Sequence, residues 1–309
     1  MAVTISIKDK CPCGSAKLGS QCCWRKTHWH KTPAIITPAL PITNFAHPKC
    51  YAHATNDCSK NISREHYISN ILLDNIAPDK DTVLMTGLTW FKKGLFTKAP
   101  KSLLVSKILC ERHNNSMSPL DNEIGKLNST FERFDKELRS GTASDEIVIL
   151  SGEDIQNWML KCVCGFASAN QIPHRTKKPI PQGWIDILFE KKVWPERWGL
   201  YLVNPAGTVH HYNSFAFEPH LTAIGGEVGF ASFYLNNFEF RLYLMSPMTD
   251  QNLIHRINCI AMNSDKYQKG IMLTWANPKY TNWVGFQLQG IYSGEPPSFP
   301  QLGVDESLC

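Results

Sequence analysis

Residues 110–138 read CERHNNSMSPLDNEIGKLNSTFERFDKEL and join a pair of metal-type ligands to the start of a helix. Ser118, Pro119 and Asp121 form a helix-start signature, with serine as the cap and proline in the first turn. Apolar residues then recur every three or four positions, as in an amphipathic helix packed on a core; they are Leu120, Ile124, Leu127, Phe131, Phe134 and Leu138. The stretch predicts a ligand-bearing turn that leads into a long helix.

A second pair of ligands stands about fifty residues earlier in the chain. Cys50 and Cys58 are separated by seven residues, whereas Cys110 and His113 are separated by two. A zinc ion can join two distant segments of a chain when each segment supplies a pair of ligands. Cys50, Cys58, Cys110 and His113 therefore predict a structural Cys₃His zinc site, and His53 is a competing nitrogen ligand.

Residues 11–23, CPCGSAKLGSQCC, place four thiols within one short stretch rich in Gly and Ser. Four thiolates are a ligand set that tetrahedral Zn²⁺ prefers, so Cys11, Cys13, Cys22 and Cys23 predict another structural zinc site. Disulfides are the alternative in a secreted protein. The first ten residues contain no apolar signal segment, so we expect a reducing, cytoplasmic location, which favours the metal.

The N-terminal pattern resembles the SEC-C zinc-binding motif, a CPCGSGK-type turn closed by a cysteine pair. The resemblance is carried by Cys11, Cys13, Gly14, Ser15, Lys17, Cys22 and Cys23. It implies a zinc module over residues 1–31 that is structural, and that in some members docks a protein partner or the ribosome. A staple that only holds the N-terminus together is the other interpretation.

Glu65 and His66 stand between the two later ligand pairs, and this order resembles zinc-clipped HNH nucleases of the ββα-metal group. The resemblance covers about residues 48–140 and follows the order Cys50, Cys58, Glu65, His66, Cys110, His113, Asn114. It implies that His66 is the general base and that Glu65 and Asn114 bind a catalytic Mg²⁺ or Mn²⁺. Asn115 is the alternative to Asn114, and Asp121 is a further carboxylate that could serve as a ligand.

These residue types suit phosphodiester hydrolysis. A histidine can take a proton from the attacking water near neutral pH. Oxygen ligands hold the hard divalent cation that neutralises charge on the phosphate and the leaving oxygen.

Composition and charge indicate a globular chain with a basic front. The 309 residues are 43% hydrophobic and 19% charged, and no apolar run reaches the length of a membrane span. Residues 1–110 carry 15 basic against 6 acidic residues, although the net charge of the whole chain is only +5. This asymmetry suits a polyanionic partner.

We expect an α+β protein with a proline-rich linker over 32–48, an HNH-like zinc and helical domain over 49–175, and a β-rich domain over 176–309. A helix over about 153–166, capped by Ser151, closes the middle domain. Period-two patterns then predict an antiparallel sandwich or barrel; the expected strands are 199–203, 208–217, 228–235, 238–244, 253–262, 270–275 and 283–291. Adjacent His210 and His211 point to opposite faces and predict no shared metal.

Two side-chain groups have ordinary core explanations. Cys162 and Cys164 lie about 200° apart on a helix and cannot grip one metal together. Trp184, Trp194 and Trp198 could stack on bases, but core packing is the favoured interpretation.

The patterns together predict a metal-dependent endonuclease that acts on nucleic acid, with DNA favoured over RNA and defence against foreign DNA as its setting. The alternative is a non-catalytic zinc-stabilised module that binds nucleic acid, the ribosome or a protein partner, through the N-terminal motif or the β-rich domain. Val105 and Ser106 stand where many HNH members have an Asn or His, which favours that alternative. An RNA-cleaving toxin would use the same residues on another polymer.

Overall fold

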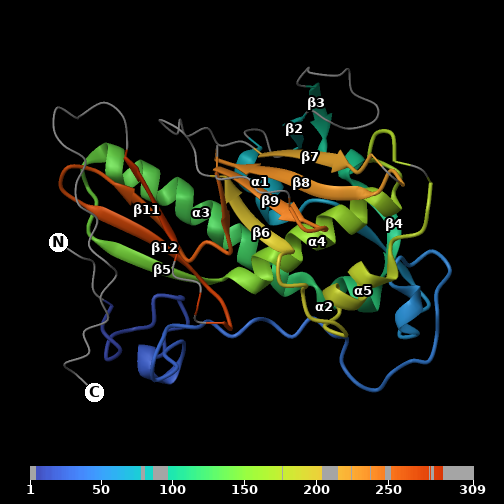
Figure 1. The fold of residues 1–309 in the computed structure, drawn as a ribbon, viewed down its shortest axis with the longest axis horizontal. Helices are drawn as coiled ribbons and strands as arrows, with labels where there is room; N and C mark the ends of the chain where they lie inside the picture. Colours follow the sequence, from blue (N-terminus) through green and yellow to red (C-terminus); the bar gives the residue numbers. More distant parts are fainter. Residues whose placement is uncertain are drawn as a thin grey trace.

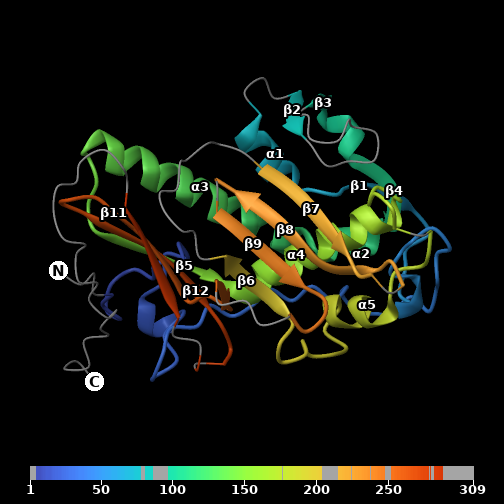
Figure 2. The same cartoon turned by 45° about the horizontal axis from the view of Figure 1, so that its top comes forward.

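The computed structural model describes residues 5–77, 81–85, 97–175, 177–203, 215–223, 225–236, 238–247, 252–277, 279 and 282–287. Two helices, α3 (Ser118–Ser140) and α4 (Gly152–Ser168), occupy the centre of the molecule (Figure 1). A five-stranded sheet covers them on one side, and a four-stranded sheet lies toward one end (Figures 1 and 2). No helix in the described ranges is both long enough and apolar enough to cross a bilayer.

The two central helices form where the periodicity predicts them. All six apolar stripe residues of α3 are buried, and Gly141 ends the helix in the left-handed conformation, with φ of 70°. The Ser151 hydroxyl caps α4 by accepting from the Asp154 N–H at 3.1 Å. Ser118 does not act as a cap, because α2 (Glu111–Ser116) runs almost directly into α3 and leaves only Met117 between them. Shorter helices are α1 (Asn70–Ile76) and α5 (Gln182–Leu188).

The five-stranded sheet is antiparallel, in the order β10-β6-β9-β8-β7. Its strands are β6 (Gly199–Val203), β7 (Phe215–Leu221), β8 (Val228–Leu235), β9 (Phe238–Tyr243) and β10 (Leu253–His255). The inner face packs on α4, where Phe166 stacks on Phe217 with ring centres 4.3 Å apart, and Phe233 lies 5.9 Å from Trp158. Asn236, with φ of 47°, lies in the tight turn between β8 and β9.

The four-stranded sheet is mixed, so the expectation of antiparallel pairing throughout the C-terminal half is wrong for this sheet. Its order is β13-β11-β12-β5, and both the β12–β5 and the β11–β13 pairs are parallel. The strands are β5 (Glu146–Ser151), β11 (Cys259–Asn263), β12 (Gln268–Thr274) and β13 (Trp283–Gln287). β5 precedes α4 in the chain, so this sheet contains strands from both sides of residue 175. The expected 253–262 strand is divided between the two sheets at a turn around Arg256, where φ is 47°.

Two short antiparallel pairs complete the described strands. β1 (Ile62–His66) pairs with β4 (Val105–Cys110), and β2 (Thr82–Met85) pairs with β3 (Thr97–Pro100). Ile62 lies opposite Cys110 and His66 lies opposite Val105, so Glu65 and His66 are at the end of β1 away from Cys110. Short 3₁₀ helices occur at Gly19–Gln21, His53–Thr55 and Lys101–Leu104.

The N-terminal residues lie against the body of the protein and then run along its lower edge (Figure 1). Cys11, Cys23 and Trp29 are buried against Ile149 of β5 and Met272 of β12. The following segment is extended, but it is tied down in several places. The N–H of Ala34 donates to both carboxylate oxygens of Asp154, at 3.0 and 3.2 Å, and the ammonium of Lys31 pairs with Glu123 of α3.

Candidate metal centres and candidate active site

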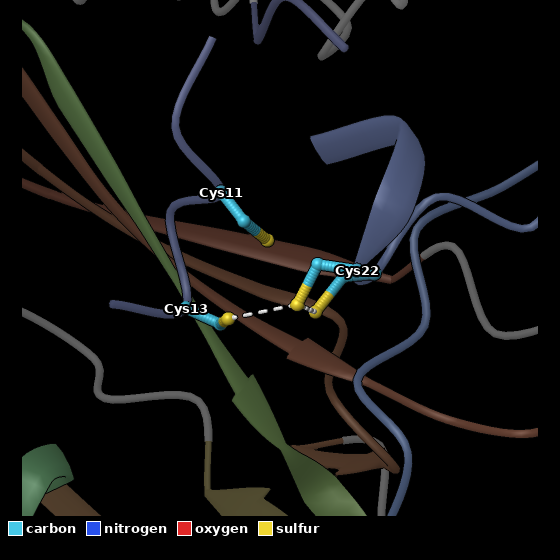
Figure 3. Close-up of side chains that lie close together, drawn as sticks. Cys11, Cys13 and Cys22 are labelled. Carbon is cyan, nitrogen blue, oxygen red and sulfur yellow. Dashed lines mark hydrogen bonds between the residues drawn. The ribbon is translucent and has the colours of Figure 1, made fainter. Parts of the chain in front are cut away.

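The four N-terminal cysteines form one cluster. Their sulfur atoms all lie within 4.8 Å of one another, and the sulfurs of Cys11, Cys13 and Cys22 point toward a common centre (Figure 3). Sγ of Cys22 is 3.5 Å from Sγ of Cys13 and 3.7 Å from Sγ of Cys23. Tetrahedral zinc with Zn–S bonds of about 2.3 Å separates its sulfur ligands by about 3.8 Å, so the four thiols could hold such an ion.

Neighbouring groups favour a thiolate at Cys13, whereas burial raises the pKa of Cys11 and of Cys23. The Ser15 hydroxyl lies 3.0 Å from the Cys22 sulfur. Burial raises the pKa of Cys13, but hydrogen bonds from Ser15 and Cys11 outweigh it and bring the pKa to about 7. A lowered thiol pKa promotes metal binding, because the thiolate is the ligand.

The second cluster is fully buried and contains the predicted set, Cys50, Cys58, Cys110 and His113. Nδ1 of His113 lies 3.6 Å from the sulfur of Cys50, 3.8 Å from that of Cys58 and 3.1 Å from that of Cys110. A zinc ion with ordinary bond lengths separates a sulfur from a nitrogen ligand by about 3.6 Å. The loop before β1 supplies the first two sulfurs, and the junction of β4 with α2 supplies the third sulfur and the imidazole.

Hydrogen bonds around His113 favour its ligating tautomer. The Thr55 hydroxyl donates to the carbonyl of Ala52 at 2.8 Å, so its oxygen is left to accept from Nε2–H of His113, 3.0 Å away. With the proton on Nε2, Nδ1 has a free lone pair that faces the three sulfurs. The hydrogen bond between Cys50 and Cys110 lowers the pKa of Cys110 and raises that of Cys50, so one of the two is the favoured thiolate. The geometry therefore suits a closed structural metal site.

His53, the competing ligand, is outside this cluster. Its side chain is exposed, and its Nδ1 lies 2.9 Å from the carbonyl oxygen of Cys50.

Other contacts surround the second cluster. The proline-rich segment 32–48 is held nearby, because the Arg112 guanidinium pairs with Asp57 at 2.9 Å and donates to the Pro41 carbonyl at 2.9 Å. The ring of buried Phe189, directly after α5, packs edge-on against His113 at 4.8 Å.

Glu65 and Asp121 are brought together by a buried lysine. Oε1 of Glu65 lies 2.9 Å from Nζ of Lys161, which also contacts the two carboxylate oxygens of Asp121 at 2.9 and 2.8 Å. These groups come from β1, α4 and α3, and the side chains of Lys161 and Glu65 are only 4% and 5% exposed. We call Glu65, Asp121 and Lys161 the buried triad. Burial acts against the charge of Lys161, but the two carboxylates raise its pKa above the ordinary value.

His66 follows Glu65 in β1 and is half-buried. Burial is the main cause that lowers its pKa, and the positive charge of Lys161 lowers it further, while Asp121 acts in the opposite direction. Asn114 is half-buried on α2 and Asn115 is exposed. Within the described ranges, neither amide side chain makes a hydrogen bond to Glu65, His66 or Asp121.

Lys161 is the site residue that the sequence reasoning missed. It is the one charged residue between Ile155 and Ala167, an otherwise largely apolar stretch of α4. A lone lysine in such a stretch indicates a buried ion pair, because an uncompensated buried charge is very costly. The signal existed, but it does not identify the two acidic partners.

The remaining candidates are explained by packing or lie elsewhere. Cys162 and Cys164 are completely buried in the core, and Trp184 is buried with 5% of its surface exposed. Trp194 donates its indole N–H to Asn157 at 3.1 Å, and Trp198 packs against the core. His210 and His211 are outside the described residues.

Comparison with known proteins supplies no relative for this chain. No family model, no curated protein and no solved structure matches it. Its function is therefore argued from the geometry of these side chains.

Proposed function

We propose that the protein is a metal-dependent phosphodiesterase of the HNH type that cuts nucleic acid, with DNA as the favoured substrate. One observation carries the proposal. Glu65 and His66 lie at the end of β1, and Lys161 joins Glu65 to a second carboxylate, Asp121 of α3, which is 56 residues later in the chain. The antiparallel β1–β4 pair is followed directly by α2 and has a Cys₃His cluster at its base, which supports a ββα-metal unit, with α1, β2 and β3 inserted between its two strands.

His66 is the proposed general base. Its lowered pKa means that the neutral imidazole, which can accept a proton from water, predominates at neutral pH. The side chain is half-buried and so keeps some access to solvent. The strand fixes its backbone, because His66 is paired with Val105.

The carboxylates of Glu65 and Asp121 are the proposed ligands of Mg²⁺ or Mn²⁺, with the amide of Asn114, or of Asn115, as a further oxygen donor. Two carboxylates and one lysine give the buried triad a formal net charge of −1, which attracts a cation, while burial raises the pKa of Glu65. Hard oxygen donors are the ligands that these metals prefer. When bound, the metal supplies charge stabilisation for the phosphate and the leaving oxygen.

The two cysteine-containing clusters have a structural role in this proposal. With four protein ligands each, they leave no open position on zinc for catalysis. The N-terminal cluster is proposed to be a SEC-C-like module, and its docking on β5 and β12 supports a stapling role on that face. The excess of basic over acidic residues in 1–110 supplies the electrostatic attraction for a phosphate backbone.

A cleavage assay tests the proposal. Purified protein is incubated with plasmid DNA and with RNA in Mg²⁺ or Mn²⁺, alongside His66→Ala and a control, His174→Asn, at an exposed histidine. Asparagine suits the control because residue 174 has φ of 62°. We expect the parent and the control to cut and His66→Ala to lose cutting by at least about a hundredfold. Equal inactivity of all three proteins would refute the nuclease.

The position of Lys161 favours a second function, a non-catalytic zinc-stabilised module that binds nucleic acid, the ribosome or a protein partner. In this alternative the ammonium of Lys161 permanently satisfies both carboxylates, and no divalent cation is needed. Binding of labelled DNA or RNA without cleavage, unchanged in His66→Ala, would support it.

A further inference from the structure

We propose that the ammonium of Lys161 and a divalent cation compete for the carboxylates of Glu65 and Asp121, so that Lys161 sets the metal affinity of the candidate active site. The inference rests on the proposed function for the location of the metal. It makes Lys161 a positioning residue, one that controls the ligands without touching the substrate.

The first support is the location of the positive charge. Nζ of Lys161 is within 2.9 Å of oxygens on both carboxylates, so it occupies the position between them that a bridging cation would take. One ammonium and one divalent cation cannot occupy that position together. The two cations also repel each other strongly at short range where the effective dielectric constant is low.

The second support is that a single ammonium holds both carboxylates. Nζ of Lys161 is 2.9 Å from the buried Oε1 of Glu65 and also donates to the two oxygens of Asp121. Loss of this one group would leave both carboxylates without their cation, and a buried carboxylate without a partner is costly. A divalent cation would relieve that cost.

The third support is a route for entry. The side chain of Asp121 is 23% exposed, against 5% for Glu65. Asp121 is therefore the carboxylate that a hydrated cation meets first. Displacement of Lys161 from Asp121 would then let the cation reach Glu65. Without the ammonium between them, the two carboxylates would keep their full negative charge, which attracts a divalent ion.

Mn²⁺ binding to purified protein tests the inference without reference to cleavage. Free Mn²⁺ is measured by electron paramagnetic resonance in the parent, in Lys161→Met, which removes the charge but keeps the length, and in Lys161→Arg, which keeps the charge. Removing the competing charge should tighten Mn²⁺ binding at least about tenfold in Lys161→Met, with little change in Lys161→Arg. Asp121→Asn in the Lys161→Met background should abolish the gain. Zinc content is measured in parallel and should be equal in all variants.

The outcomes separate this inference from the proposed function. Unchanged or weaker Mn²⁺ binding in folded Lys161→Met overturns the inference, because a merely structural lysine would give that result. If Lys161→Met unfolds without metal, Mn²⁺ should restore its folding, as judged by circular dichroism, and failure of Mn²⁺ to do so also overturns it. Tighter Mn²⁺ binding in Lys161→Met, with no cleavage by the parent, would support the competition and refute only the nuclease.

Discussion

Thr55 is expected to control metal affinity at the second cluster, although its own oxygen is not a ligand. Substitution by valine keeps the shape but removes the oxygen that accepts from Nε2–H of His113 at 3.0 Å. His113 is completely buried, so its N–H would lose its partner without gaining water. Leaving a buried donor unsatisfied costs about 1–3 kcal/mol. Loss of an outer-shell partner weakens metal binding about 10–100-fold, which corresponds to about 1.4–2.7 kcal/mol.

The assay is equilibrium competition for zinc against a chromogenic chelator. Cys110→Ser removes a ligand of the second cluster, so it identifies which part of the release curve belongs to that cluster. Thr55→Ser retains the hydroxyl and should bind zinc like the parent. Thr142→Val, at an exposed threonine, controls for the loss of a hydroxyl elsewhere. Equal zinc affinity in Thr55→Val and Thr55→Ser would refute the assignment of Nδ1 as the ligand atom.

Two further predictions concern the start of α4. Burial is the main cause that raises the pKa of Glu153 to about 7, so the folded chain binds this proton more tightly than the unfolded chain and stability falls as pH rises toward 7. Glu153→Gln should therefore have a larger free energy of unfolding than the parent, by as much as about 3 kcal/mol at pH 7.5 and by little at pH 4. Urea denaturation at the two pH values measures this difference. A difference that does not depend on pH would contradict the prediction. At Gly152 an added Cβ would lie 2.5 Å from the ring of Trp275, so Gly152→Ala should cost about 1–3 kcal/mol. Gly183→Ala, on α5 with no atom within 4 Å of the new Cβ, should instead gain about 0.5–1 kcal/mol, and equal melting temperatures for the two variants would refute the packing argument.

The metal-type clusters could be predicted because each of their ligand sets is made of short local pieces. Cys11 and Cys13, Cys22 and Cys23, and Cys110 and His113 are close in sequence, so local geometry already holds each pair near one point. Sequence alone left His53 open as a ligand. The structure excludes it from the cluster because its ring turns outward to the carbonyl of Cys50.

The helices α3 and α4 were also predictable, since their apolar periodicity and the Ser151 cap are local signals. The strand boundaries of β6 and β8 agree with the sequence expectation for the same reason. The pairing of β5 with β12 was not predictable. The two strands lie more than 100 residues apart in the chain. The sequence of an apolar strand does not indicate which strand pairs with it, or whether the pairing is parallel or antiparallel.

The sequence by itself therefore determined which residues could ligate metal, the two long helices α3 and α4, and most of the strands after residue 199. Only the tertiary structure decided that the N-terminal cysteines pack on β5 and β12, and that a lysine of α4 lies between Glu65 and Asp121. The physical reason is that ligand type and periodicity are properties of a local stretch of chain. The partner of a buried charge, by contrast, depends on which distant elements pack against it.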